Sequence, residues 1–294
     1  MRLQHALFKW IPVAVFVIII ISVSIPFFVR QGRRSKNDDG YDVLLDYRPK
    51  EEVDPSAIYV RLIVSNMNTH TFDITTAASV QNGVPKPLLN PKTGALDQPI
   101  RVQIQTGVLE LTKNSVKIDT PLVSKILVAK GTIAWYPFDK YNVRMLIVAS
   151  QGGTFLSGEN ITTIPIEPQV VSPKDYAWTF KATKSDRVAT GIKTIEIEVS
   201  RDYTLYTALV FIGIWAVTFS IAYIGSMSVI WERRPADYPV IYISALFAVP
   251  IFRNTLPGTP PYGVLFDILC TYFAIAVISV FNVLVAIAYI KRKV

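Results

Sequence analysis

The stretch IFRNTLPGTPPYGVLFD, from Ile251 to Asp267, interrupts the most apolar part of this chain. It places an arginine, an asparagine, three prolines and an aspartate between the apolar segments YISALFAVP and ILCTYFAIAVISVFNVLVAIAYI. Pro257-Gly258 and Pro260-Pro261 cannot continue a helix, so they predict a stiff turn that returns the chain. The stretch therefore predicts a helical hairpin with a positive charge, Arg253, at one end of the turn and a negative charge, Asp267, at the other.

The composition around this hairpin is that of a membrane protein. Apolar residues make up 51% of the chain and charged residues 18%, fewer than the roughly 25% of ordinary soluble domains. Residues 11–29 and 203–231 carry no charge, and residues 264–290 carry only Asp267. Each block can cross a hydrocarbon core of roughly 30 Å at about 1.5 Å per residue. They predict three transmembrane helices.

A further apolar block, residues 238–252, is shorter and contains Pro239 and Pro250. It is either a span or a re-entrant or buried segment, and we count it as a span, which gives four. The segments between the blocks are then a cytoplasmic loop at 232–237 and an outer Pro/Gly turn at 253–263. The chain ends are a cytoplasmic N-terminus at 1–10 and a cytoplasmic tail at 291–294, because basic residues flank the spans on that side.

The first apolar block is either a cleaved signal peptide or an anchor. Its run to Val29 is longer than the usual apolar region of a signal peptide, about 7–15 residues, which favours an uncleaved anchor. The basic group Arg30, Arg33, Arg34 and Lys36 just beyond it opposes this orientation. A long translocated domain weighs little in the positive-inside rule, however, so we keep both termini inside.

Between the first two spans, residues 30–40 read as a linker and residues 41–202 as a β-rich domain. Apolar and polar residues alternate there, as in half-buried antiparallel strands. The alternating runs are Val60 to Val64, Val102 to Ile104, Tyr141 to Ile147 and Ile195 to Val199. Turn residues separate about seven or eight strands, which favours a sandwich. The predicted fold class is a membrane α + β protein: four transmembrane helices with a β-sandwich-like extracytoplasmic domain inserted between helices 1 and 2.

Catalytic and metal-binding signatures are missing from the sequence. It has two histidines and one cysteine, Cys270, and it lacks the GxSxG, GxGxxG and P-loop patterns. We therefore expect no enzyme activity, no metal and no cofactor. The net charge of +8 is explained by the basic flanks of the spans, so we expect no nucleic acid as a partner. Asn160-Ile161-Thr162 fits the weak acceptor pattern for N-glycosylation.

The motif WYPFDKY, Trp135 to Tyr141, stands directly before a predicted strand. Tyr136 belongs to its aromatic face, and Pro137 fixes its backbone. Phe138 can plug the end of the sandwich or the membrane face, and Asp139 can accept hydrogen bonds from backbone amides of the turn. We interpret the motif as a structured corner.

Together these features resemble one known family. One span, a β-rich outer domain with YPFDKY, a basic loop WERRPADYP, the opening stretch and a long last span are similar to the "domain of unknown function 4436" family. The likeness runs from about Tyr41 to Ile290, and Arg-Asn...Pro-Gly-x-Pro-Pro-x-Gly...Asp is its most specific part. The resemblance implies an integral membrane protein of this arrangement and supplies no activity. The candidate residues in this part are Arg253, Asn254, Pro257, Gly258, Pro260, Pro261, Gly263 and Asp267.

A charge at mid-bilayer costs about 2.5–3.5 kcal/mol, so we expect Arg253 and Asp267 to pair near the outer surface, where snorkelling helps. The predicted function is a non-enzymatic binding, scaffolding or assembly component. One alternative is a channel or transporter subunit with this pair near a polar path, and a second is a membrane-associated enzyme. We expect the partners to be the bilayer and other membrane proteins or further copies of the chain. The location is the plasma membrane or, in a eukaryote, another membrane of the secretory pathway, with several spans.

Overall fold

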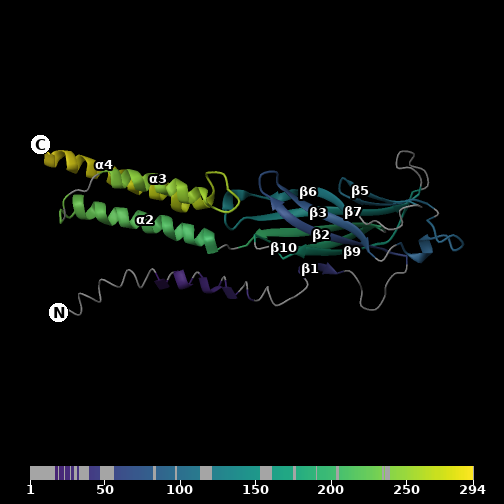
Figure 1. Ribbon diagram of the computed structural model, residues 1–294. Coiled ribbons are helices and arrows are strands. Elements are labelled where there is room, and N and C mark those ends of the chain that lie inside the picture. The colour runs from purple at the N-terminus through teal and green to yellow at the C-terminus, as the bar shows by residue number, and fades with distance from the viewer. Residues whose placement is uncertain are drawn as a thin grey trace. The chain divides into compact units, whose positions relative to one another are not determined.

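The computed structural model describes scattered residues between 17 and 32, then 40–46, 56–81, 84–96, 98–112, 121–152, 161–174, 177–189, 191–202, 205–233, 235 and 239–293. The chain forms two compact units (Figure 1). The β unit comprises Asn37–Thr132 and Lys140–Asp202. The helical unit comprises Met1–Lys36, Ile133–Asp139 and Tyr203–Val294. A seven-residue piece of the predicted β-rich domain thus belongs to the helices.

Among its described residues the β unit holds one sheet of eleven strands, whereas the sequence predicted about seven or eight. The strands are β1 (Tyr41–Asp46), β2 (Ile58–Asn68), β3 (Asp73–Gln81), β4 (Ile100–Ile104), β5 (Gly107–Leu111), β6 (Leu122–Gly131), β7 (Lys140–Gln151), β8 (Thr162–Thr163), β9 (Ile166–Pro173), β10 (Trp178–Ala189) and β11 (Ile192–Arg201). The main path through the sheet is β1-β9-β2-β3-β6-β7-β11-β10, with β4 and β8 paired to β7 and β5 paired to β4.

The sequence predicted an antiparallel sheet, and the structure shows a mixed one, because β2 and β9 pair in parallel. Strand β9 lies between β1 and β2; it runs antiparallel to β1 and parallel to β2, from Ile58 opposite Ile166 to Ile63 opposite Val171. Alternation of apolar and polar residues shows which face of a strand is buried, but it carries no information on the direction of the neighbouring strand.

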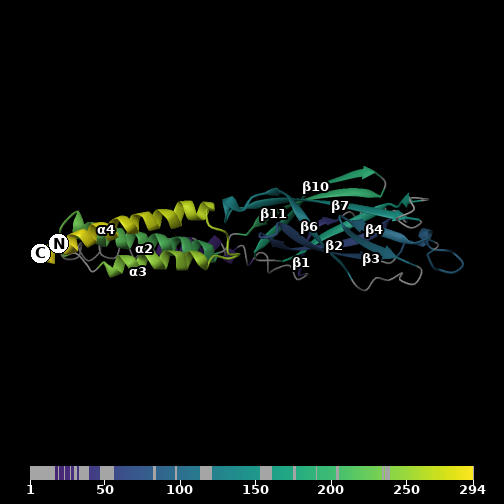
Figure 2. The same cartoon turned by 90° about the horizontal axis from the view of Figure 1, so that it is seen from above.

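Strand β6 connects the two halves of the sheet. Its first part, Leu122 to Leu127, pairs with β3, and its last part, from Val128, pairs with β7. Buried side chains of both halves form one core, as in a sandwich. The predicted alternation holds in β7, where Tyr141, Val143, Met145 and Ile147 are buried and the residues between them are exposed. Figure 2 shows the strands from a second direction.

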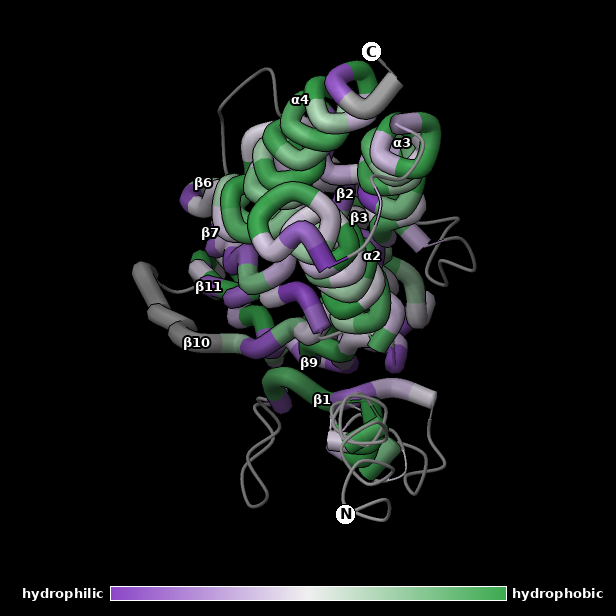
Figure 3. The backbone as a smooth tube through the Cα atoms, turned by 90° about the vertical axis from the view of Figure 1, so that its left-hand side faces the viewer, coloured by the Kyte–Doolittle hydropathy of each residue, from purple (hydrophilic) through white to green (hydrophobic). Residues whose placement is uncertain are grey.

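The helical unit contains α2 (Leu205–Val229), α3 (Val240–Asn254), a π-helical turn η3 (Asp267–Thr271) and α4 (Tyr272–Lys293). Figures 1 and 2 both show these helices side by side. Gly225 of α2 lies so close to Phe281 of α4 that an added Cβ would stand 2.4 Å from Phe281 Cδ1. Figure 3 shows that most residues of the three helices are hydrophobic, drawn in green.

Two of the predicted spans have helices of sufficient length. Leu205–Val229 and Asp267–Lys291 are each 25 residues long and apolar enough to cross a membrane. Helix α3 has 15 residues with Pro250 inside it, and it is shorter than an ordinary span. Of the predicted first span, the described residues between Val17 and Val29 are helical. Among the described residues, two helices rather than four therefore meet the requirement for crossing a bilayer.

Candidate functional site

The predicted partners Arg253 and Asp267 form a two-pronged ion pair between the end of α3 and the start of the last helical segment. Arg253 Nε donates to Asp267 Oδ1 at 2.8 Å, and Nη2 donates to Oδ2 at 2.9 Å. The two side chains are 3% and 0% exposed. The predicted pairing is present, and the protein itself encloses both groups.

The Pro/Gly turn provides the remaining partners of the guanidinium group. Arg253 Nη1 donates to the carbonyl of Pro260 and Nη2 donates to that of Pro261, each at 2.7 Å. The ring of Tyr262 lies against the guanidinium group, 4.0 Å from the centroid to Cζ. Together with the two hydrogen bonds to Asp267, these two bonds use four of the five N–H donors of the arginine. The turn therefore wraps the charge that the sequence places before it.

Asp267 has further donors on its own side. The amide of Gly263 donates to Oδ2 at 2.9 Å, and the hydroxyl of Thr271 donates to Oδ1 at 3.1 Å. An acidic side chain in the first helical turn that accepts from a preceding backbone amide satisfies one of the unpaired N–H groups of a helix start. Asp267 thus joins Arg253, the turn and the beginning of the last helical segment.

The path of the turn depends on its glycines. Gly258 and Gly263 have φ values of +75° and +96°, a backbone region that favours glycine. Pro257, Pro260 and Pro261 fix the φ angles between them. Asn254, after Arg253, accepts a hydrogen bond at 2.8 Å from the hydroxyl of Tyr262 in an exposed position. Of the turn residues singled out in the sequence, Pro260, Pro261 and Gly263 therefore bind the ion pair, and Asn254 binds Tyr262 instead.

The structure brings the YPFD motif to the same turn. Tyr136 is fully buried; its hydroxyl donates to the carbonyl of Pro257 at 3.1 Å, and its ring meets Phe266 edge-on. Phe138, which we predicted to plug either the end of the sandwich or the membrane face, is 67% exposed, and Tyr136 is the buried aromatic residue of the motif. Asp139 is buried as well. The sequence identified both motifs but gave no signal that they meet.

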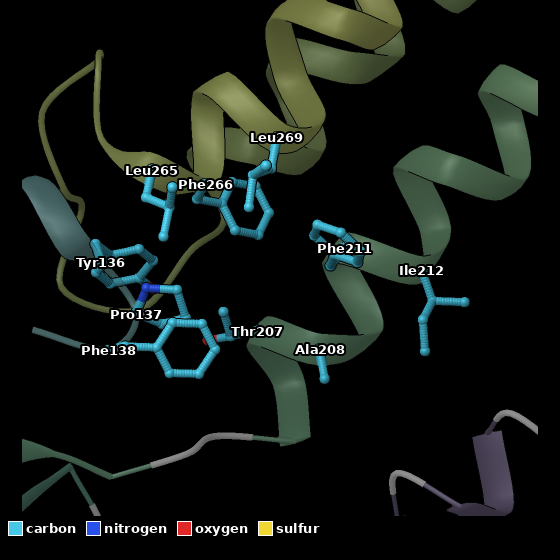
Figure 4. Close-up of a pocket in the computed structure, with 10 residues that line it drawn as sticks. All are labelled: Tyr136, Pro137, Phe138, Thr207, Ala208, Phe211, Ile212, Leu265, Phe266 and Leu269. Atoms are coloured by element: carbon cyan, nitrogen blue, oxygen red, sulfur yellow. The ribbon is translucent and has the colours of Figure 1, made fainter.

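An apolar pocket of about 390 Å³ lies beside Tyr136 (Figure 4). Three segments of the helical unit form it: the YPFD segment, the first turns of α2 and the start of the last helical segment. Its lining residues are Tyr136, Pro137, Phe138, Thr207, Ala208, Phe211, Ile212, Leu265, Phe266 and Leu269. Sequence reasoning missed this pocket, because nothing in the sequence indicates that the YPFD segment meets the starts of these two helical segments.

A histidine and the cysteine lie in different units. His70 is exposed in the turn after β2, whereas Cys270 is buried in the same π-helical turn as Asp267. The glycosylation candidate Asn160 lies outside the described residues. In the part of the chain that the structure describes, no group of three or more His, Cys, Asp or Glu side chains could hold a metal ion.

Two family models match the sequence. The model of a domain of unknown function (DUF4436) matches residues 48–199, and the model of a second domain of unknown function (DUF8686) matches residues 200–292. The boundary between the two matches falls where the last strand of the β unit ends and the helices follow. No curated protein matches the chain.

Proposed function

The chain belongs to the DUF4436 family, whose description assigns no activity, and we propose that it is an integral membrane protein that presents its β unit as a binding or scaffolding surface. In this proposal the helices anchor the chain, the β unit lies outside the cytoplasm, and the buried ion pair holds the hairpin together. The proposed role is non-enzymatic, and the proposed partners of the chain are other membrane proteins or further copies of the chain.

The exposure of the helices supports a membrane location. Only 28% of the most apolar stretch of Leu205–Val229 and 17% of that of Asp267–Lys291 is buried. An apolar core helix of a soluble protein would be mostly buried. Large apolar side chains instead point outward along all three helices: Phe219, Val240, Phe247, Ile251, Val280, Val283 and Ile290. Such a continuous apolar surface is stable in lipid and costly in water.

We further propose four spans with both termini in the cytoplasm. The first block and α3, extended by its flanking residues, would complete the two long helices. Arg233 follows α2 and Lys291 lies at the end of α4, and basic residues of this kind favour the cytoplasmic side. The turn with Arg253 and Asp267 then lies at the outer end of the helices.

The main support for a structural role of the site is that both groups of the ion pair already have several hydrogen-bond partners inside the protein. Arg253 donates four hydrogen bonds inside the protein, and Asp267 accepts from Arg253, Gly263 and Thr271. A charged group that lines a transport path must exchange partners with an ion or with water. Groups already enclosed by their own turn are suited to holding a hairpin, which favours the anchor over the channel or transporter alternative.

The β unit offers exposed apolar side chains for binding. On the outward face of β6, Val123 and Leu127 are 63% and 72% exposed with the exposed Lys125 between them, while Ser124 and Ile126 point inward. A surface that combines exposed apolar side chains with a charge is suited to contact with another protein. We assign the proposed binding surface to this face of β6.

Two fractionation experiments test the anchor. Alkaline carbonate should leave the chain in the membrane pellet, and detergent should release it. Protease added to the outside of sealed vesicles should digest the β unit and spare the tail at Lys291. Release by carbonate would contradict the membrane location, and cleavage of the tail from outside would contradict the orientation.

A purification experiment tests the binding role. The chain is cross-linked in cells, purified in mild detergent and analysed for co-purifying proteins, with Val123→Asp on β6 compared with Val43→Asp on β1, since Val43 is also exposed, at 58%. Loss of a specific partner in the first variant only supports the proposed face. Equal recovery in both variants would contradict it, and a flux of ions through liposomes containing the pure chain would instead favour the channel alternative.

A further inference from the structure

We propose that the apolar pocket beside Tyr136 is a binding site for one acyl chain of a membrane phospholipid. This inference rests on the proposed membrane location of the helical unit. The pocket is built by residues of the helical unit alone.

The chemistry of the lining selects a hydrocarbon. Of the ten lining residues, only Tyr136 and Thr207 have a polar side-chain group. The hydroxyl of Tyr136 donates to the carbonyl of Pro257, and Thr207 is buried in the first turn of α2. The remaining lining side chains offer no hydrogen bond to a polar ligand. An occupant therefore gains affinity by burying apolar surface.

The pocket is a groove open to its surroundings, and its size is that of a ligand site. A volume of about 390 Å³ falls in the range of ligand pockets, about 300–1,000 Å³. Figure 4 shows Phe138 on one side and Phe211 with Phe266 on another, so aromatic rings from three separate segments frame the space.

The position of the pocket along the helices indicates that the hydrocarbon is a lipid acyl chain. The end of α3 and the start of the last helical segment are joined by the Pro/Gly turn, and Cys270 Sγ lies 3.9 Å from the carbonyl oxygen of Phe211, which brings the start of α2 to the same end. The exposed side chains Trp135, Tyr206 and Tyr262 belong to this end. Such aromatic residues mark the boundary between headgroups and acyl chains.

The pocket begins just inside that boundary. Ala208 and Ile212 lie about 5 and 10 Å along the axis from Leu205, the start of α2. A phospholipid whose headgroup is level with the aromatic residues would place its upper acyl chain there. A free polar ligand would not partition to this depth, and the pocket has no cation to hold its charge, since Arg253 is enclosed by the turn.

The test is photolabelling of the full chain in phosphatidylcholine vesicles that contain a phosphatidylcholine with a diazirine in its acyl chain. Mapping of labelled peptides should find Phe211, Ile212 and Leu265 to Leu269 enriched over the exposed residues Phe219 and Phe247. Equal labelling of all of these residues would mean an ordinary lipid annulus and would overturn the inference.

A matched pair of variants sharpens the test. Ala208→Phe puts a ring into the pocket and should lower its labelling by about tenfold, because the ring removes room for at least two methylene groups. Ala222→Phe makes the same change about 21 Å further along the same face of α2, outside the pocket, and should leave the labelling unchanged. Equal effects of the two variants would contradict the site.

A competition experiment on the unaltered chain avoids any dependence on folding of the variants. In detergent micelles, unlabelled phosphatidylcholine should displace the photolabel from the pocket peptides, and a sterol, whose rigid fused rings differ in shape from an acyl chain, should not. Displacement by the sterol as good as or better than that by phosphatidylcholine would overturn the assignment to an acyl chain. Carbonate extraction of the same preparation separates the two proposals. Release of the chain by carbonate would contradict the membrane location. Retention of the chain without labelling of the pocket peptides would contradict only the acyl-chain site.

Discussion

The β unit and the helical unit distribute polarity in opposite ways. In the β unit the apolar side chains of both halves of the sheet point into one core, and an ion pair such as Arg101 with Glu110 lies at the surface, with side chains 18% and 45% exposed. In the helical unit large apolar side chains face outward, and the ion pair of Arg253 and Asp267 is enclosed. An arginine–carboxylate ion pair therefore lies at the surface in one unit and in the interior in the other.

The difference teaches what each pair can contribute. A surface pair contributes about 0–1 kcal/mol, because water competes for both charges. A buried pair is not a large net gain, but loss of one partner costs about 3–5 kcal/mol, since the other charge stays buried. The following substitutions, in order of expected effect, measure whether the helical unit depends on enclosed polar contacts as this comparison requires.

The largest effect is expected from Asp267→Ala. It removes the partner of the Arg253 guanidinium and leaves the amide of Gly263 without its acceptor, so the free energy of unfolding should fall by about 3–5 kcal/mol. Unfolding of the detergent-solubilised chain measures this. Glu110→Ala, which breaks the exposed pair of the β unit, is the control and should cost about 0–1 kcal/mol. Similar losses in the two variants would remove the distinction between the units.

The second prediction concerns the coupling of the two charges. Replacement of both Arg253 and Asp267 by alanine should cost less than the sum of the single replacements, by up to about 3 kcal/mol, because the double variant leaves no unpaired charge. The same unfolding measurement supplies the cycle. Additivity within about 0.3–0.5 kcal/mol would show that the charges act independently.

A smaller effect is expected where α2 and α4 pack. Gly225→Ala places a Cβ 2.4 Å from Phe281 Cδ1 and 2.9 Å from its Cγ, so the ring must shift, and we expect a loss of about 1–3 kcal/mol. Gly213→Ala is the matched control in the same helix, because an added Cβ there meets nothing within 4 Å. It should be neutral or stabilising by up to about 1 kcal/mol. Equal behaviour of the two variants would contradict close packing at Gly225.

The smallest effect is expected at the contact between the YPFD segment and the turn. Tyr136→Phe removes the hydroxyl that donates to the carbonyl of Pro257 and should cost about 0.5–1.5 kcal/mol. Tyr262→Phe removes a hydroxyl that donates to Asn254 at an exposed position, and it should cost less. A larger loss at Tyr262 than at Tyr136 would contradict the role of the buried tyrosine.

Much of the local structure could be predicted from the sequence. The alternation from Tyr141 to Ile147 showed the buried face of β7, and the prolines after Arg253 predicted the turn. These features depend on neighbouring residues, so a local pattern contains them. The charge pair followed from the high cost of an unpaired charge in an apolar setting.

The remaining features arise from contacts between distant segments. The parallel pairing of β2 with β9 and the hydrogen bond from Tyr136 to Pro257 join residues far apart in the chain. No periodicity in the sequence indicates which distant segments come into contact. The burial of Arg253 was missed for a related reason: the enclosing groups are the backbone carbonyls of Pro260 and Pro261, and every residue has a carbonyl.

The position of β9 has a consequence for how the chain is made. Its partners β1 and β2 leave the ribosome first, and β9 follows roughly a hundred residues later. At about 5–20 residues per second, β1 and β2 wait roughly 5–20 s for β9. During this time one edge of β2 is free to pair with another nascent chain. The sheet can be completed only after β9 has been synthesised, so chaperones that hold extended segments are expected to bind the first two strands.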